Sequence, residues 1–221
     1  MMDVFERIEL RRFVGRELLL WLWFETEVFE ATLSTKLHGS FGMWIEGRLV
    51  LSAGQEVTTI KGSMPGHHRE AKEALLRGKL PDVASIHLSW ADHEATFTLK
   101  AESMAIAGLK LPKRESENEG VAAGEGIIAP PRRPRRKAAT ANVAGDEAHE
   151  ELYERMRVTR EIETIVEALY RDFLVLRLGP AWSELVAPAL ETWSEGGAID
   201  ADDYGTARTK ALAGAKGSPK K

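Results

Sequence analysis

The chain has 221 residues and a formal net charge of −4; 43% of its residues are hydrophobic and 29% are charged. These proportions are typical of a soluble globular protein, and the length allows one core with an appendage or two small units. The sequence contains no cysteine, which excludes disulfide bonds, thiolate metal sites and a cysteine nucleophile.

The sequence does not indicate a membrane protein or a secreted protein. The longest apolar run, residues 18–24, is far shorter than the roughly 20 residues that cross a bilayer. Asp3 and Glu6 precede every apolar run, which is unlike a secretory signal peptide. We therefore expect a cytoplasmic protein that has no membrane partner.

The first predicted element is a helix over residues 14–28, which includes the stretch GRELLLWLWFETE. Large apolar residues recur at helical spacing and surround most of this helix: Leu18, Trp21, Leu22, Trp23 and Phe24. Such a helix is normally packed on both sides, so we expect the aromatic residues in the core. A partner-binding surface and a base-stacking platform are the alternatives for this stretch, and a strand is the competing assignment.

A β-hairpin is predicted next, because GMWIEGRLVLS, residues 42–52, holds two short apolar runs joined by Glu46-Gly47. A third strand is predicted over about residues 56–61. A short helix should follow from about His67 to Leu76, ending before Gly78, which suits the residue after a helix end.

A second hairpin is predicted in ASIHLSWADHEATFTLK, residues 84–100, and its register can be stated. With Ala91-Asp92 as the turn, Trp90 faces His93, Leu88 faces Ala95 and Ile86 faces Phe97. This register places the apolar residues on one face and the Ser, Thr and His residues on the other, as a half-buried antiparallel sheet requires. A last extended segment is predicted from Met104 to Leu111.

Residues 113–148 are poor in aromatic residues and rich in Gly, Ala, Pro, Glu and Arg, so we expect a disordered linker. Helical order should return near Glu150, with a break at Gly179-Pro180 and a second helix bent at Pro188. One apolar stripe is predicted along the first helix: Leu152, Met156, Ile162, Ile165, Val166, Leu169, Phe173 and Leu176.

The sequence therefore predicts an α+β fold with an antiparallel sheet of about five strands and flanking helices. Residues 1–112 form the predicted core and residues 113–148 the linker. Residues 149–195 form a helical hairpin that docks on the core or on a second subunit, and residues 196–221 form a disordered tail.

No motif supports catalysis or metal binding. His67 and His68 are adjacent and lack the spacing of metal ligands, so we expect solvent-exposed or capping histidines. The sequence contains no GxGxxG, no Walker A loop and no GxSxG. We expect a protein that is not an enzyme and uses no cofactor.

Two groups of basic residues are candidate contacts to phosphate. The segment PRRPRRK, residues 131–137, is kept extended by its prolines and carries Arg132, Arg133, Arg135, Arg136 and Lys137, which suit phosphates or a minor groove. A solubilising linker is the alternative for this segment. Arg77 and Lys79 form the second group, at the end of the predicted short helix, where Gly78 is expected to turn the chain and leave Lys79 exposed.

The order of a helix, ALLRGKL (74–80), SIHLSWADHEATFTL (85–99) and LKLP (109–112) resembles the C-terminal part of the RdgC family of recombination-associated proteins. LYRDFLVLRLGPAWSELV, residues 169–186, is similar to the closing helical segment of that family. GRELLLWLWF is similar to the tryptophan-bearing segment that precedes its sheet.

The resemblance implies a non-enzymatic protein that binds duplex DNA without sequence preference and restrains RecA-driven recombination. Members of the family form a ring-shaped dimer around DNA, and Lys79 corresponds to a lysine at the start of the family's sheet. The long N-terminal half of the family has no counterpart here, so the resemblance implies duplex contact through a basic face rather than a closed ring.

We therefore expect a sequence-independent DNA-binding protein of recombination or repair that associates with the nucleoid. Its expected partners are duplex DNA and further copies of the chain, with a dimer as the simplest oligomer. The alternative is a protein-interaction or assembly module that does not bind nucleic acid.

Overall fold

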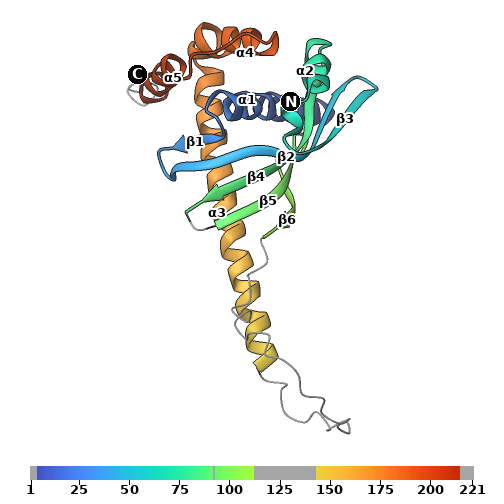
Figure 1. The fold of residues 1–221 in the computed structure, drawn as a ribbon, viewed down its shortest axis with the longest axis vertical. Helices are drawn as coiled ribbons and strands as arrows, with labels where there is room; N and C mark the ends of the chain where they lie inside the picture. Colours follow the sequence, from blue (N-terminus) through green and yellow to red (C-terminus); the bar gives the residue numbers. More distant parts are fainter. Residues whose placement is uncertain (1–3, 92, 112–142, 215–221) are drawn as a thin grey trace, which may run out of the picture.

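The computed structural model describes residues 4–91, 93–111 and 143–214 (Figure 1). In chain order their α-helices and strands are α1 (Val4–Val28), β1 (Thr32–Thr35), β2 (Gly39–Ala53), β3 (Glu56–Gly62), α2 (Arg69–Leu76), β4 (Leu80–Trp90), β5 (His93–Lys100), β6 (Ile106–Lys110), α3 (Val143–Leu178), α4 (Ala187–Ser194) and α5 (Ala201–Gly214). A 3₁₀ turn (Pro65–His67) precedes α2, and a π-helical turn (Trp182–Val186) precedes α4.

The strands form one antiparallel sheet in the order β1-β2-β4-β5-β6, with β3 also paired to β2. Gly42 pairs with both β1 and β4, and Leu49 pairs with both β3 and β4, so β1 and β3 follow each other along the same edge of β2. The predicted α+β class with an antiparallel sheet is confirmed.

The predicted register of the second hairpin is also confirmed. Trp90 pairs with His93, Leu88 with Ala95 and Ile86 with Phe97. Ile86, Leu88, Ala95, Phe97 and Leu99 are buried, Trp90 at the hairpin end is half-buried, and the Ser, Thr and His residues between them are also only half-buried. On this second face Trp44 of β2 stacks on His87, with ring centroids 4.1 Å apart.

The hairpin turn predicted at Glu46-Gly47 is wrong, because β2 runs through this point without turning. β4 pairs with Ile45 on one side and with Leu49 on the other, so residues 46–48 oppose the single residue Ser85. This arrangement is a β-bulge, and Gly47 adopts the positive φ, 79°, that favours glycine there. The turn after β2 lies instead at Gly54-Gln55, between β2 and β3.

Helix α1 lies across β2 and β4 on one face of the sheet, and α3, α4 and α5 cover its other sides (Figure 1). Leu18, Trp21, Trp23 and Phe24 are each at most 1% exposed. Aromatic pairs join α1 to each outer helix: Trp21 to Phe173 of α3, Trp23 and Phe24 to Trp193 of α4, and Phe24 to Tyr204 of α5. The expectation of a helix packed on both sides is confirmed.

Helix α3 begins at Val143, seven residues before the predicted position near Glu150, and it ends at the predicted break, Gly179-Pro180. No single helix in the described part of the chain is long and apolar enough to cross a membrane. Leu152–Leu178 and Trp182–Ser194, bent by 89°, reach that length and composition only as a pair.

The prediction of a disordered tail from residue 196 is wrong for residues 201–214, which form α5. The carboxylate of Asp200 accepts hydrogen bonds from the backbone N–H groups of Asp202 and Asp203, which caps the start of the helix. Tyr204 and Arg208, one turn apart, are both buried against Glu25 of α1. Their partner lies 179 residues away from Tyr204 in sequence, so local patterns could not reveal it.

Glu25 is fully buried and forms the main polar contact between α1 and α5. Its carboxylate lies 2.9 Å from Nε of Arg208 and accepts a 2.8 Å hydrogen bond from the Tyr204 hydroxyl. Burial raises the pKa of Glu25, and the charge of Arg208 opposes that shift. Burial and the carboxylate of Glu25 together raise the pKa of Tyr204, so Tyr204 remains a hydrogen-bond donor.

The variant Arg208→Met should lower the free energy of unfolding by about 3–5 kcal/mol at pH 8, since it leaves a buried carboxylate without its charge partner. The loss should be smaller at pH 5, because burial raises the pKa of Glu25 and each protonated carboxyl carries no uncompensated charge. Urea denaturation at both pH values measures this difference.

Lys210→Met, on the exposed side of the same helix, serves as the control and should change the free energy of unfolding by no more than about 0.5 kcal/mol. Glu25→Gln combined with Arg208→Met should cost less than the sum of the two single changes. Additive costs would contradict the coupling of the two residues.

Candidate functional site

Arg77, the first of the predicted phosphate contacts on the folded part, is exposed at the C-terminal end of α2. Its guanidinium forms no hydrogen bond or ion pair with another residue that the structure describes. Arg77 is therefore available to an anionic partner.

The expectation that Lys79 is exposed is wrong. Lys79 is only 8% exposed, and its Nζ donates a 3.1 Å hydrogen bond to Thr58 and lies 3.1 Å from the carboxylate of Glu56. Gly78, with φ of 79°, turns the chain directly into β4, and the lysine side chain reaches across β2 to β3. Its charge is neutralised within the fold.

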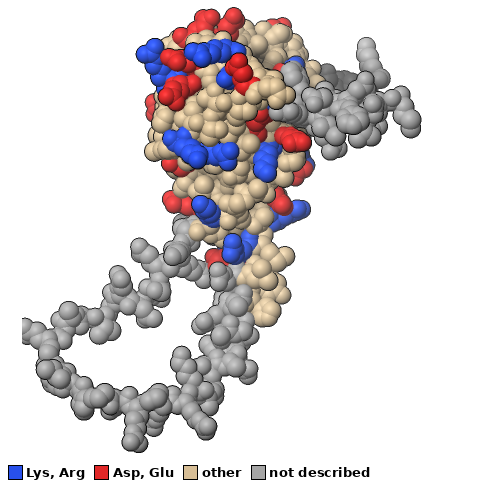
Figure 2. All heavy atoms as spheres, turned by 90° about the vertical axis from the view of Figure 1, so that its right-hand side faces the viewer, with Lys and Arg blue, Asp and Glu red and all other residues tan. Residues whose placement is uncertain are grey.

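The other predicted contacts, Arg132, Arg133, Arg135, Arg136 and Lys137, lie outside the described residues. On the face that Figure 2 shows, Lys and Arg side chains are interspersed with Asp and Glu and do not form one basic patch. The folded part thus presents no continuous positive surface on this face.

The two adjacent histidines lie on different elements. His67 ends the 3₁₀ turn, and His68 occupies the N-cap position of α2 without a side-chain hydrogen bond to the helix. Both are exposed. Within residues 4–91, 93–111 and 143–214, no group of three or more His, Asp or Glu side chains is placed to hold a metal ion.

Glu27, near the end of α1, is the centre of a cluster that the sequence did not reveal. Its carboxylate accepts hydrogen bonds from the indole N–H groups of Trp23, at 2.6 Å, and Trp193, at 2.8 Å. Nζ of Lys72 donates a third, at 2.9 Å. Residues of α1, α2 and α4 therefore converge on one carboxylate.

Lys72 also lies against the two indole rings of this cluster. Its Nζ is 3.1 Å from the ring centroid of Trp193 and 5.1 Å from that of Trp23, within the range of cation–π attraction. Burial lowers the pKa of Lys72, and the carboxylate of Glu27 opposes that shift. The only local signal in the sequence was the spacing of Trp23 and Glu27, four residues apart on one helix.

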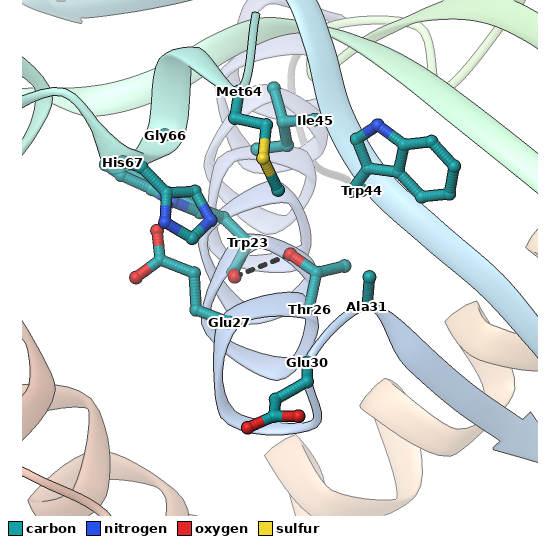
Figure 3. Close-up of a pocket in the computed structure, with 10 residues that line it drawn as sticks. All are labelled: Trp23, Thr26, Glu27, Glu30, Ala31, Trp44, Ile45, Met64, Gly66 and His67. Atoms are coloured by element: carbon teal, nitrogen blue, oxygen red, sulfur yellow. Dashed lines mark hydrogen bonds between the residues drawn. The ribbon is translucent and has the colours of Figure 1, made fainter.

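A cavity of about 260 Å³ lies beside this cluster, next to the end of α1 (Figure 3). It is also lined by Trp44 and Ile45, in the middle of β2, between the part that pairs with β1 and the part that pairs with β3. In Figure 3, His67 and Glu27 lie on one side of the cavity, and Trp44 lies on the opposite side. The complete lining is Trp23, Thr26, Glu27, Glu30, Ala31, Trp44, Ile45, Met64, Gly66 and His67.

The backbone around the cavity is unusually strained. Glu30, Ala31 and Met64 all have positive φ, at 47°, 64° and 46°. A side chain on Gly66 would place its Cβ 2.4 Å from Nε1 of Trp23, so only glycine permits this approach. Strain of this kind persists only where the surroundings fix it.

The second surface that the sequence did not reveal lies on α3. Leu152, Tyr153 and Met156 are 54%, 70% and 61% exposed, and we refer to them as the α3 patch. Leu152 and Met156 were predicted to belong to the buried stripe, and this prediction is wrong. At about 100° per residue they lie about 120° and 160° around the helix from the buried Val158, so they face away from the core.

Comparisons with protein-family models, with curated proteins and with solved structures returned no match for this chain. The similarity to the RdgC family stays a prediction, and so do the activity and partners that it implies.

Glu27→Gln should lower the free energy of unfolding by about 2 kcal/mol, because it removes the charge partner of Lys72 and weakens two partly buried indole hydrogen bonds. The midpoint of urea denaturation, followed by tryptophan fluorescence, measures the loss. Glu30→Gln is the matched control: the same change three residues along, at an exposed side chain, should cost less than about 0.5 kcal/mol. Equal losses in the two variants would contradict a structural role for the Glu27 cluster.

Proposed function

We propose that this chain is a non-enzymatic assembly module that forms a homo-oligomer through the α3 patch. The observation that carries the proposal is the exposure of three large apolar side chains on adjacent turns of a helix whose opposite face belongs to the core. The first turns of α3 extend away from the sheet (Figure 1), so a partner can reach the patch.

The cost of leaving these side chains in water supports the proposal. Full burial of a Leu or Met side chain stabilises by about 1.5–3 kcal/mol. Clustered exposed apolar residues mark interaction sites more often than isolated ones do, and Tyr and Met are both enriched at protein interfaces.

The titratable groups with shifted pKa values are explained by structural contacts. The Glu25–Tyr204–Arg208 contact joins α1 to α5, and Lys72 joins α2 to α1 through Glu27. Arg177, whose pKa is raised by its hydrogen bonds to Glu17, joins α3 to α1. Because each shift follows from a contact between helices, none of them calls for a catalytic role.

Leu152→Ser combined with Met156→Ser should convert the oligomer to a monomer, since it removes the apolar surface that association buries. Light scattering at about 50 μM, where micromolar association is saturated, should give at least twice the 24.5 kDa of one chain for the unmodified protein and about one chain for the variant.

Leu178→Ser is the control for this experiment, because Leu178 is exposed at the far end of the same helix. It should leave the mass unchanged. A mass of one chain for the unmodified protein at this concentration would contradict the proposed function.

A second candidate function is sequence-independent binding of duplex DNA through Arg132, Arg133, Arg135, Arg136 and Lys137, with Arg77 as a further contact. The exposure of Arg77 and the absence of a charge partner for it among the described residues favour this candidate. Oligomerisation would also multiply the number of cations that one particle offers to a duplex.

Replacing the five linker cations by alanine should weaken retention of a duplex in a gel-shift titration. The logarithm of the affinity of the unmodified protein should fall with the logarithm of salt concentration, with a slope of about −5 for about six phosphate contacts.

A variant with the same loss of charge on the folded part, Arg48, Lys61, Arg69, Lys100 and Lys110 to alanine, should retain most of the affinity. Equal weakening in both variants would contradict a specific role for the linker cations. A flat salt dependence would contradict DNA binding altogether.

A further inference from the structure

We infer that two copies of this chain pair through α3 in antiparallel orientation, about a two-fold axis beside residues 154 and 155. The inference rests on the proposed self-association and adds to it the orientation of the two helices and the residues that meet.

The surface of α3 leaves room for a second helix along this face. From His149 through the α3 patch to Arg160, Glu163 and Glu167, the outward side of α3 is exposed, with the side chains of Arg160 and Glu167 at 78% and 59%. Residues 149, 153, 156 and 160 follow the 4-3-4 spacing with which paired helices contact each other. A partner helix can therefore lie along the stretch from His149 to Arg160, whereas Glu163 and Glu167 line a groove with residues 102–106 at the β5–β6 connection.

The charge pattern selects the orientation. Residues 146–154 contain five acidic residues and no basic one, and residues 155–160 contain three arginines and no acidic residue. Two of these arginines, Arg157 and Arg160, also form exposed ion pairs with Glu161 and Glu163 of their own helix, which contribute little and leave them open to a second copy. A parallel pair would place the acidic segments of the two copies beside each other, which is unfavourable. An antiparallel pair places each acidic segment beside the arginines of the other copy, and symmetry forms this contact twice.

The apolar residues meet in the same arrangement. About this axis Tyr153 lies opposite Met156 of the second copy, and His149 lies opposite Arg160 of the second copy. Leu152, about 40° around the helix from Met156, lies at the edge of the same contact, beside Met156 of the second copy. Both copies of the α3 patch then share one small apolar core, flanked on each side by opposite charges.

The absence of native cysteine makes a direct test possible. His149→Cys and Arg160→Cys are prepared separately, one of them with a tag, then mixed in equal amounts and oxidised. The antiparallel pair should give mainly the mixed disulfide on a non-reducing gel, because positions 149 and 160 face each other across the axis. A disulfide between two copies of position 149 is excluded in that arrangement, since 11 residues of helix separate them by about 16 Å.

Arg171→Cys mixed with His149→Cys is the matched control: Arg171 lies on the outward side of the same helix but far from position 149 of the second copy, so no mixed disulfide should form. Disulfides of each single variant with itself would indicate a parallel pair and overturn the inference. An oligomer by mass that gives no mixed disulfide would overturn the orientation and leave the proposed function standing. A protein that is monomeric by mass would overturn both.

A second measurement tests the charge argument without cysteine. Glu150→Lys, Glu151→Lys and Glu154→Lys together should weaken self-association about tenfold or more, and so should Arg155→Glu, Arg157→Glu and Arg160→Glu together. Mixing the two triple variants should restore a dimer of the original mass, because the basic α3 segment of one variant then lies beside the acidic α3 segment of the other. Failure of the mixture to associate, with both variants folded by circular dichroism, would overturn the antiparallel assignment.

Discussion

The structure depends on covering one helix, α1, on all sides. Its apolar residues surround it, so the sheet alone cannot bury it, and a second layer of helices is required. Three carboxylates on α1 anchor that layer at separate points. Glu17 pairs with Arg177 of α3, Glu25 with Arg208 of α5, and Glu27 binds Lys72 of α2 and Trp193 of α4. Glu25 is fully buried, so removing its partner is costly, and the half-buried Glu17 and Glu27 add weaker contacts that help to hold the helices in a fixed arrangement.

The same constraint explains why the first turns of α3 do not pack on the core. From Val158 to Leu176, α3 buries one side against the rest of the fold. Its preceding turns extend beyond that contact, and there the apolar residues lie on the opposite side. A helix end that served only as a connection would normally be polar all round. Lys79, which was expected to be exposed, forms an ion pair with Glu56. The charged surface of the folded part therefore supports a nucleic-acid partner less than the α3 patch supports a protein partner.

The elements that could be predicted from sequence are those whose causes are local. Alternation within residues 84–100 fixed the pairing of β4 with β5, and the all-round apolarity of α1 indicated a packed helix. The wrong predictions concern residues whose conformation depends on contacts far away in sequence. Gly47 forms a bulge only because β4 runs beside both halves of β2, and α5 is ordered by Glu25, far away in sequence. The α3 patch was missed because the apolar residues of α3 lie on one side of the helix before Val158 and on the other side after it. Spacing along the sequence alone does not reveal this change of side.

Assembly and DNA binding, if both proposals are followed, are linked by charge. The acidic residues of 146–154 stand close in sequence to the cations of 132–137. Under both proposals, pairing of α3 would place those acids beside Arg155, Arg157 and Arg160 of the second copy, and they would then compete less with phosphate for the linker cations. Binding of a duplex and pairing of α3 would then favour each other by the same factor, as linkage requires. Screening by salt would weaken the charge contacts in both, whereas the apolar contact of the α3 patch is not screened, so DNA would be released at lower ionic strength than the oligomer dissociates.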